Sequence, residues 1–389
     1  LHGGKAPYWL FERMKKLARE MIILIVSEYG AYEFLHRISD PLWFQAFGCV
    51  LGFDWHSSGL TTTVCGAIKE AIKGLEKDLG LFVAGGKGKT SRKTPDEIEN
   101  AANITGIEYS NLIYSSKMVA KVDSSALQDS YQLYHHCFMF TKDGKKWAVI
   151  QQGMNEDTRL ARRYHWLSEN VSNFVCEPHS AICCDRKSLV LNLVATESEE
   201  ARDAITFLSN EKPEKVIEDL KKINKCIQKK CIHGDFLTFE RGANRTNHIY
   251  NENYVVEKGS KVAHPLPVHT LPVRHFIKPE DIDPSRLSKI LISTYENRPK
   301  DFESLLSIKG VGPKTIRALA LIAEMVYSTK CSIKDPVRFS FAHGGKDGHP
   351  YPVDRESYDL SIDILHKAIK ESKIGRTEKI EAIKRLLKF

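Results

Sequence analysis

Apolar residues recur at helical spacing in the N-terminal part of the chain. Between residues 10 and 40 they fall three or four positions apart, at Leu10, Met14, Leu17, Met21, Leu24 and Ile25. A second series follows on one face, at Val64, Ile68, Ile72, Leu75 and Leu79. This spacing is typical of amphipathic helices. The pattern predicts two or three helices in the region that ends at Leu81.

The pattern then changes to that of β-structure. Residues 119–122 are a short predicted strand that ends at Asp123. Residues 131–141 and 146–151 flank Lys142-Asp-Gly-Lys145, and Asp-Gly is a strong signal for a hairpin turn. Residues 188–194 (Ser-Leu-Val-Leu-Asn-Leu-Val) predict another strand. The fold class expected for this part is therefore α/β (α+β), with a mixed or antiparallel sheet.

Helical patterns return towards the C-terminus. They cover residues 199–231, a region from Asp283-Pro284 to about Ala323, and residues 358–388. Residues 263–275 are rich in proline, which favours an extended segment and a domain boundary. We predict a large α/β catalytic domain over residues 1–270. An all-α helix-hairpin-helix domain is expected over residues 271–389.

The composition is that of an ordinary globular protein. The chain has 389 residues with 42% hydrophobic and 27% charged residues, which argues against disorder and against fibrous structure. The longest apolar run, Met21–Val26, is too short to cross a membrane. A formal net charge of +8 is compatible with a nucleic-acid partner but does not establish one. The nine cysteines form no C-x-x-C pair. They are expected to be reduced thiols in a cytoplasmic protein.

Residues 308–320 (Ile-Lys-Gly-Val-Gly-Pro-Lys-Thr-Ile-Arg-Ala-Leu-Ala) resemble a helix-hairpin-helix motif. The two glycines permit positive φ angles and a close backbone approach. The free N–H groups of the second helix attract a phosphate without reading bases. The predicted DNA contacts are Gly310, Gly312, Lys314, Thr315 and Arg317. The alternative is a glycine-containing turn between two core helices.

Lys314 also permits a different interpretation of the same region. In helix-hairpin-helix DNA glycosylases, a lysine after the hairpin and a later aspartate form the active site, and Asp335 follows Lys314 in a similar way. An amine nucleophile beside a carboxylate suits Schiff-base chemistry at an abasic sugar. The proline-rich segment, however, lies too close to the hairpin for the helices that this fold needs.

Residues 84–95 form a glycine-rich basic loop (Ala-Gly-Gly-Lys-Gly-Lys-Thr-Ser-Arg-Lys-Thr-Pro). A P-loop would require glycine at position 83, where Val83 stands. We therefore expect a loop that contacts phosphates through Lys87, Lys89, Arg92 and Lys93, or a solvated basic loop. Thr94 is the expected N-cap of the next helix, with Glu97 three residues later.

The large domain is dense in polar residues that could carry chemistry. A nuclease that depends on metal needs carboxylates to hold Mg²⁺ or Mn²⁺ beside an activated water. The predicted metal ligands are Asp54, Asp123, Asp129 and Glu177, and the predicted catalytic residues are Asp54, His56, Asp123 and Glu177. Single histidines are more often structural than ligands. In a strand, His135 and His136 face opposite sides.

Several motifs together resemble one protein family. They are His2-Gly-Gly-Lys-Ala-Pro7, Asp54-Trp-His-Ser-Ser-Gly59, Tyr134-His-His136, Gln151-Gln-Gly-Met-Asn155, Arg163-Tyr-His-Trp166 and His343-Gly-Gly345. The chain is similar over most of its length to an uncharacterised archaeal and bacterial family, domain of unknown function 763. That resemblance implies a prokaryotic, cytoplasmic setting and brings no catalytic residues with it.

The sequence thus predicts a DNA-processing enzyme, a metal-dependent nuclease that acts on phosphodiester bonds. The alternatives are a DNA-binding or repair-accessory protein without catalysis, and a glycosylase or lyase that uses Lys314 and Asp335. DNA is the expected partner, and no membrane association is expected. The sequence leaves open whether the chain forms a homo-oligomer.

Overall fold

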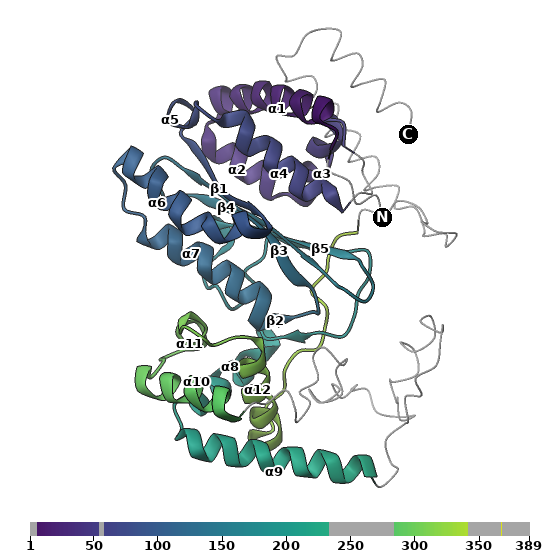
Figure 1. Cartoon of the computed structure of the whole chain (residues 1–389), viewed down its shortest axis with the longest axis vertical. Coiled ribbons are helices and arrows are strands. Elements are labelled where there is room, and N and C mark those ends of the chain that lie inside the picture. The colour runs from purple at the N-terminus through teal and green to yellow at the C-terminus, as the bar shows by residue number, and fades with distance from the viewer. Residues whose placement is uncertain (1–5, 54–57, 233–283, 341–366, 368–389) are drawn as a thin grey trace, which may run out of the picture. The chain divides into compact units, whose positions relative to one another are not determined.

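The computed structural model describes residues 6–53, 58–232, 284–340 and 367. The chain divides into two compact units (Figure 1). The first contains Leu1–Ser188 and Asp335–Phe389, and the second contains Leu189–Lys334. The boundary predicted at residue 270 lies outside the described residues and stays a prediction. So do the proline-rich segment and the helix predicted at residues 358–388.

Over the part of the chain that the structure describes, the first unit begins with five helices, where the apolar spacing predicted two or three. They are α1 (Tyr8–Tyr29), α2 (Ala31–Ser39), α3 (Pro41–Val50), α4 (Gly59–Ile72) and the short α5 (Glu76–Leu79). Helix α1 buries Met14, Met21 and Ile25 on one face. Gly30, with φ of 86°, separates α1 from α2. The Asp40 carboxylate accepts hydrogen bonds from the first turn of α3 and so fixes where that helix starts.

A five-stranded antiparallel sheet forms the centre of this unit. Its order is β1 (Leu81–Lys87), β3 (Gln132–Thr141), β4 (Trp147–Met154), β5 (Ala161–Leu167) and β6 (Ala181–Cys183). The hairpin predicted around Asp143-Gly144 joins β3 to β4 and is confirmed. The fold is mixed α and β with an antiparallel sheet, as the sequence predicted.

Helices cover both faces of the sheet (Figure 1). On one face, Cys137, Met139 and Ile150 pack in a hydrophobic core with residues of α1–α4. On the other face lie α6 (Thr94–Thr105) and α7 (Ser110–Lys121). The shorter segments of the unit are β2 (Leu127–Gln128) and three helical turns: η1 (Gly88–Lys93), η2 (Val122–Ala126) and η3 (Ser168–Asn170).

Two local predictions in this unit are wrong. Residues 119–122, predicted as a strand, are the end of α7 and the start of the π-helical turn η2. Such a short apolar run does not distinguish a buried helix from a strand. The Thr94–Glu97 capping box is also absent. The Thr94 hydroxyl donates to Ser91 O (2.7 Å), and Glu97 accepts from Gly85 N (2.6 Å) and Lys69 Nζ (2.7 Å). Glu97 therefore holds the edge strand β1 in place.

The described part of the second unit is mainly helical. Its elements are β7 (Leu191–Asn192), η4 (Thr196–Ser198), α8 (Glu199–Ser209), α9 (Pro213–Ile232), α10 (Pro284–Asn297), α11 (Phe302–Ser307) and α12 (Pro313–Tyr327). The strand predicted over residues 188–194 is reduced to two residues. Leu305, Ile316 and Leu319 are fully buried. Within the described ranges, every helix is too short or too polar to span a bilayer.

Candidate functional site

A chain of hydrogen bonds joins buried polar residues on the α7 side of the sheet. His136 on β3 stands directly opposite Gln151 on β4. The Ser116 hydroxyl of α7 lies 2.9 Å from His136 Nε2, and His136 Nδ1 lies 2.8 Å from Gln151 Oε1. Gln151 Nε2 donates to Asp123 Oδ2 at 2.5 Å. The four side chains come from α7, β3, β4 and η2, and alternation along the strands places His136 and Gln151 on the α7 side of the sheet.

Asp123 anchors this chain at its inner end. It lies in the π-helical turn η2, and π-turns are frequent at functional sites. Its carboxylate is 1% exposed and accepts a hydrogen bond from Trp166 Nε1 (3.0 Å) as well as from Gln151. His179 Nε2 lies 2.5 Å from the other carboxylate oxygen. Two donors and the His179 ring therefore surround this buried carboxyl group and replace the hydration that it loses on burial.

The network fixes the proton positions at its outer end. The Asp123 carboxylate accepts hydrogen bonds only, so the Gln151 amide turns its NH₂ group to Asp123 and its oxygen to His136. His136 Nδ1 must then carry the proton, which leaves the lone pair on Nε2 to accept from the Ser116 hydroxyl. Burial lowers the pKa of His136, against the opposing influence of Gln151 and Asp123. The imidazole is therefore neutral near pH 7 and can accept a proton.

This outer end opens into a pocket of about 390 Å³. Ser116, His136 and Gln151 line it together with Tyr134, Arg92 and Lys117. Arg92 lies on η1 and Lys117 on α7, and both are exposed. Of the other predicted basic residues, Lys87 on β1 and Lys89 and Lys93 on η1 are also exposed. Lys87 Nζ lies 5.7 Å from the centre of the Tyr134 ring. The pocket thus joins a hydroxyl and a neutral base to a cationic rim.

A second buried cluster on this face is an ion network. Arg162 is 2.9 Å from Asp129 and 2.7 Å from Asp335, and all three side chains are 3% exposed or less. Asp129 also accepts from the Tyr164 hydroxyl at 2.6 Å. Asp335 accepts from the backbone of Ser188 at 2.9 Å. These two carboxylates are committed to pairing with Arg162.

The structure brings only some of the predicted catalytic and metal-binding residues into this region. Asp123 and Asp129 are buried and bonded as described. Glu177 is half exposed, 3.7 Å from Arg338. Asp54 and His56 lie outside the described residues. Among the described residues, these carboxylates form no group of three converging ligand atoms, and the Mg²⁺ or Mn²⁺ site stays a prediction.

The predicted hairpin lies in the second unit. Helix α11 ends at Ser307, Gly310 has φ of 95°, and α12 begins at Pro313. Lys314 is exposed, but Thr315 and Arg317 are each 3% exposed and face the helical core. Those two side chains are therefore not available to a DNA backbone in this arrangement. The motif and its role stay a prediction.

Sequence reasoning did not single out Ser116 or Lys117. A serine in the middle of a helix is an ordinary surface or core residue, and nothing in its neighbours distinguishes it. Gln151 and His136 lie in segments that stood out as polar. Only the cross-strand register shows that they pair. Ser116 could have been identified only by first placing α7 over the strand that carries His136.

The chain belongs to the family described as "Protein of unknown function (DUF763)", whose match covers residues 1–353. No curated protein and no solved structure matches the chain.

Proposed function

We propose that this member of the family is a nucleic-acid-processing enzyme that cleaves phosphodiester bonds in the pocket between η1 and α7. One observation carries the proposal: the Ser116 hydroxyl lies 2.9 Å from His136 Nε2 inside a pocket whose rim is basic. A hydroxyl paired with a base, itself oriented by a third group, is the arrangement of an activated nucleophile.

The rim of the pocket favours an anionic substrate. Arg92 and Lys117 line the pocket, and Lys87, Lys89 and Lys93 extend the positive charge along η1 and β1. Such a row of cations attracts a phosphate backbone without selecting a base sequence. DNA is therefore the proposed partner. The exposed Lys309 and Lys314 beside Gly310 would supply a second phosphate contact.

The proposed reaction uses Ser116 as the nucleophile and His136 as the base. Ser116 Oγ attacks the phosphorus while His136 Nε2 takes the hydroxyl proton. The bond from phosphorus to the leaving nucleotide oxygen then breaks, and His136 returns the proton to that oxygen. Water, deprotonated by His136, hydrolyses the phosphoserine and regenerates the Ser116 hydroxyl. Arg92 and Lys117 neutralise the charge on the transferred phosphoryl group.

The alternative is cleavage that depends on Mg²⁺ or Mn²⁺ held by Asp123 and its predicted co-ligands. In the described arrangement Asp123 already accepts from Gln151, Trp166 and His179. These donors favour the serine route, in which Asp123 orients Gln151 and, through it, His136. A binding protein without catalysis and a Lys314 lyase are the remaining alternatives.

The experiment is incubation of the chain with end-labelled single- and double-stranded DNA, with Mg²⁺, with Mn²⁺ and with EDTA. We expect cleavage that survives EDTA and a covalent protein–DNA adduct when the reaction is quenched in acid. Ser116→Ala removes the nucleophile and is expected to lower the rate by up to about 10⁶-fold. Ser115→Ala is the matched control, because Ser115 is a buried neighbour on the same helix.

Three outcomes would count against the serine route. Full activity of Ser116→Ala would remove the nucleophile. Complete loss of activity in EDTA, together with loss in Asp123→Ala, would favour the metal-dependent alternative. DNA binding without cleavage under every condition would leave a binding protein, unless borohydride traps the chain on abasic DNA through Lys314.

A further inference from the structure

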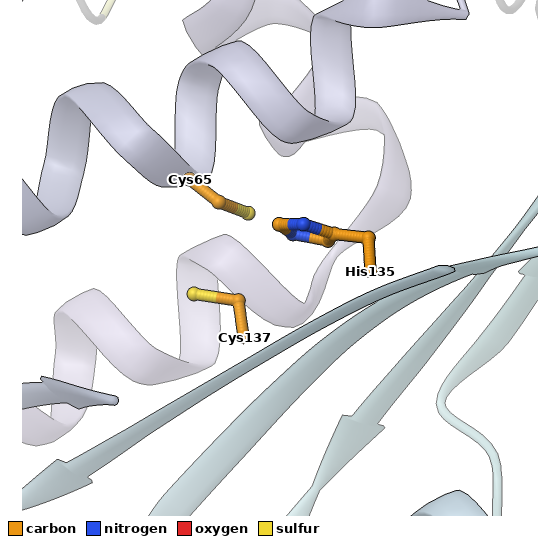
Figure 2. A group of neighbouring side chains, drawn as sticks. All are labelled: Cys65, His135 and Cys137. Carbon is orange, nitrogen blue, oxygen red and sulfur yellow. The ribbon is translucent and has the colours of Figure 1, made fainter. Parts of the chain in front are cut away.

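Three potential metal ligands converge on the opposite face of β3. His135 and Cys137 are two positions apart on the strand and both face the helix layer, where Cys65 of α4 meets them (Figure 2). A nitrogen of His135 and the two sulfur atoms all lie within 4.8 Å of one another. Their exposed fractions are 1% for His135, 1% for Cys137 and 2% for Cys65. We call this group the Cys65–His135–Cys137 cluster. His135 also lines the Ser116 pocket, whereas Cys65 and Cys137 do not.

His135 is anomalous as a core residue. Both of its ring nitrogens are buried and lack a hydrogen-bond partner within the described part of the chain. A buried polar group without a partner costs about 1–3 kcal/mol, so nearly all such groups in native proteins are satisfied. Burial, with smaller effects of His136 and Lys87, lowers the pKa of His135 to about 3. The ring is thus a neutral imidazole with a lone pair directed into the cluster.

The two thiols complete a soft donor set. Cys65 and Cys137 are hydrogen-bonded to each other, and burial raises the pKa of the Cys65 thiol. Sulfur and imidazole ligands suit zinc, whereas Mg²⁺ and Mn²⁺ take oxygen. Two thiolates would also cancel the charge of a divalent ion, leaving a buried site with no net charge.

We propose that Cys65, His135 and Cys137 bind a Zn²⁺ ion that ties helix α4 to strand β3. The described residues supply three of the four ligands that tetrahedral zinc takes. Zinc would give the His135 ring a partner. It would also cross-link the helix layer to the sheet that carries His136 on its other face. The role is structural, because the three ligands are buried in the packed core.

The test is the zinc content of the full chain, purified under reducing conditions without a metal-affinity step. We expect about one zinc per chain for the wild type and for the control Cys331→Ser, which alters a buried cysteine of the other unit. Cys65→Ser and Cys137→Ser are expected to lose the metal. Replacement by Co²⁺ is expected to give thiolate-to-cobalt charge-transfer absorption in the wild type.

The cobalt spectrum of the wild type does not depend on whether a variant folds. The proposal is overturned if the wild type, reconstituted with Zn²⁺ or Co²⁺, binds no metal or shows no thiolate band. Equal zinc in Cys65→Ser and wild type would likewise show an adventitious site elsewhere. A chain prepared without reductant that binds no metal and has two titratable thiols fewer than its nine cysteines would contain a disulfide, and this result would also overturn the proposal.

Discussion

Replacing Arg162 with methionine tests how the buried ion network contributes to folding. The Arg162 side chain is fully buried and lies 2.9 Å from Asp129 and 2.7 Å from Asp335. Its guanidinium also stacks on the Tyr131 ring, 4.4 Å from the ring centre. Methionine has a similar volume and can keep the ring contact. The substitution therefore removes the charge while leaving a small cavity at most.

The expected loss is about 3–5 kcal/mol of unfolding free energy at neutral pH, the usual cost of leaving buried charges without their partner. Burial already raises the pKa of Asp129 above its usual value, and Arg162 opposes that rise. Without Arg162, the pKa of Asp129 in the folded protein rises further. A carboxyl with a higher pKa in the folded than in the unfolded state binds its proton more tightly when folded. The free energy of unfolding of the variant therefore increases as the pH falls through the pKa of Asp129 in the folded protein.

The assay is urea unfolding of wild type, Arg162→Met and the control Arg186→Met at about pH 7 and about pH 4.5. Arg186 is exposed, so its variant is expected to match the wild type within about 0.5 kcal/mol. The deficit of Arg162→Met is expected to shrink at the lower pH. Adding Asp129→Asn to Arg162→Met is expected to recover part of it at neutral pH. A deficit below about 1 kcal/mol, or one independent of pH, would refute the reasoning.

Three further predictions concern the edge strand, the basic loop and the hairpin. Gly85→Ala is expected to cost at least about 3 kcal/mol in thermal or urea unfolding, because its Cβ would lie 2.2 Å from the His136 carbonyl oxygen at φ of 88°. Gly88→Ala, with open space at φ of 61°, is the control and should cost about 1–2 kcal/mol; equal costs would contradict the clash. Arg92→Ala is expected to flatten the log–log salt dependence of DNA binding by about 0.9, and an unchanged slope would remove Arg92 from the interface. Lys314→Ala should weaken DNA binding in a titration. Arg317 is buried, and burial lowers its pKa to about 9, so Arg317→Met should not reduce the affinity for DNA. A loss of affinity in Arg317→Met but not in Lys314→Ala would refute the hairpin geometry.

Periodicity was sufficient to predict that the region before Leu81 is helical, though not that its described part holds five helices, and to predict the hairpin of β3 and β4. Both predictions depend on local patterns. The apolar face of a helix can be recognised from a few turns of sequence. The hairpin can be recognised from two alternating segments on either side of Asp143-Gly144. The same reasoning failed at residues 119–122, where a few apolar residues fit a strand and a helix equally well. The position of α7 above the sheet resolves that ambiguity.

The sequence alone indicated the family, a mixed α and β fold and the opposite orientation of His135 and His136, since strand alternation separates neighbouring side chains. Whether the sheet is mixed or antiparallel was left open and is decided by the strand pairing. The sequence did not determine which residues each histidine meets. Only the packing of α7 brings Ser116 to His136, and only the packing of α4 brings Cys65 to His135. Both contacts depend on how whole layers stack on the sheet. That stacking is set by the summed burial of many apolar side chains rather than by any local spacing.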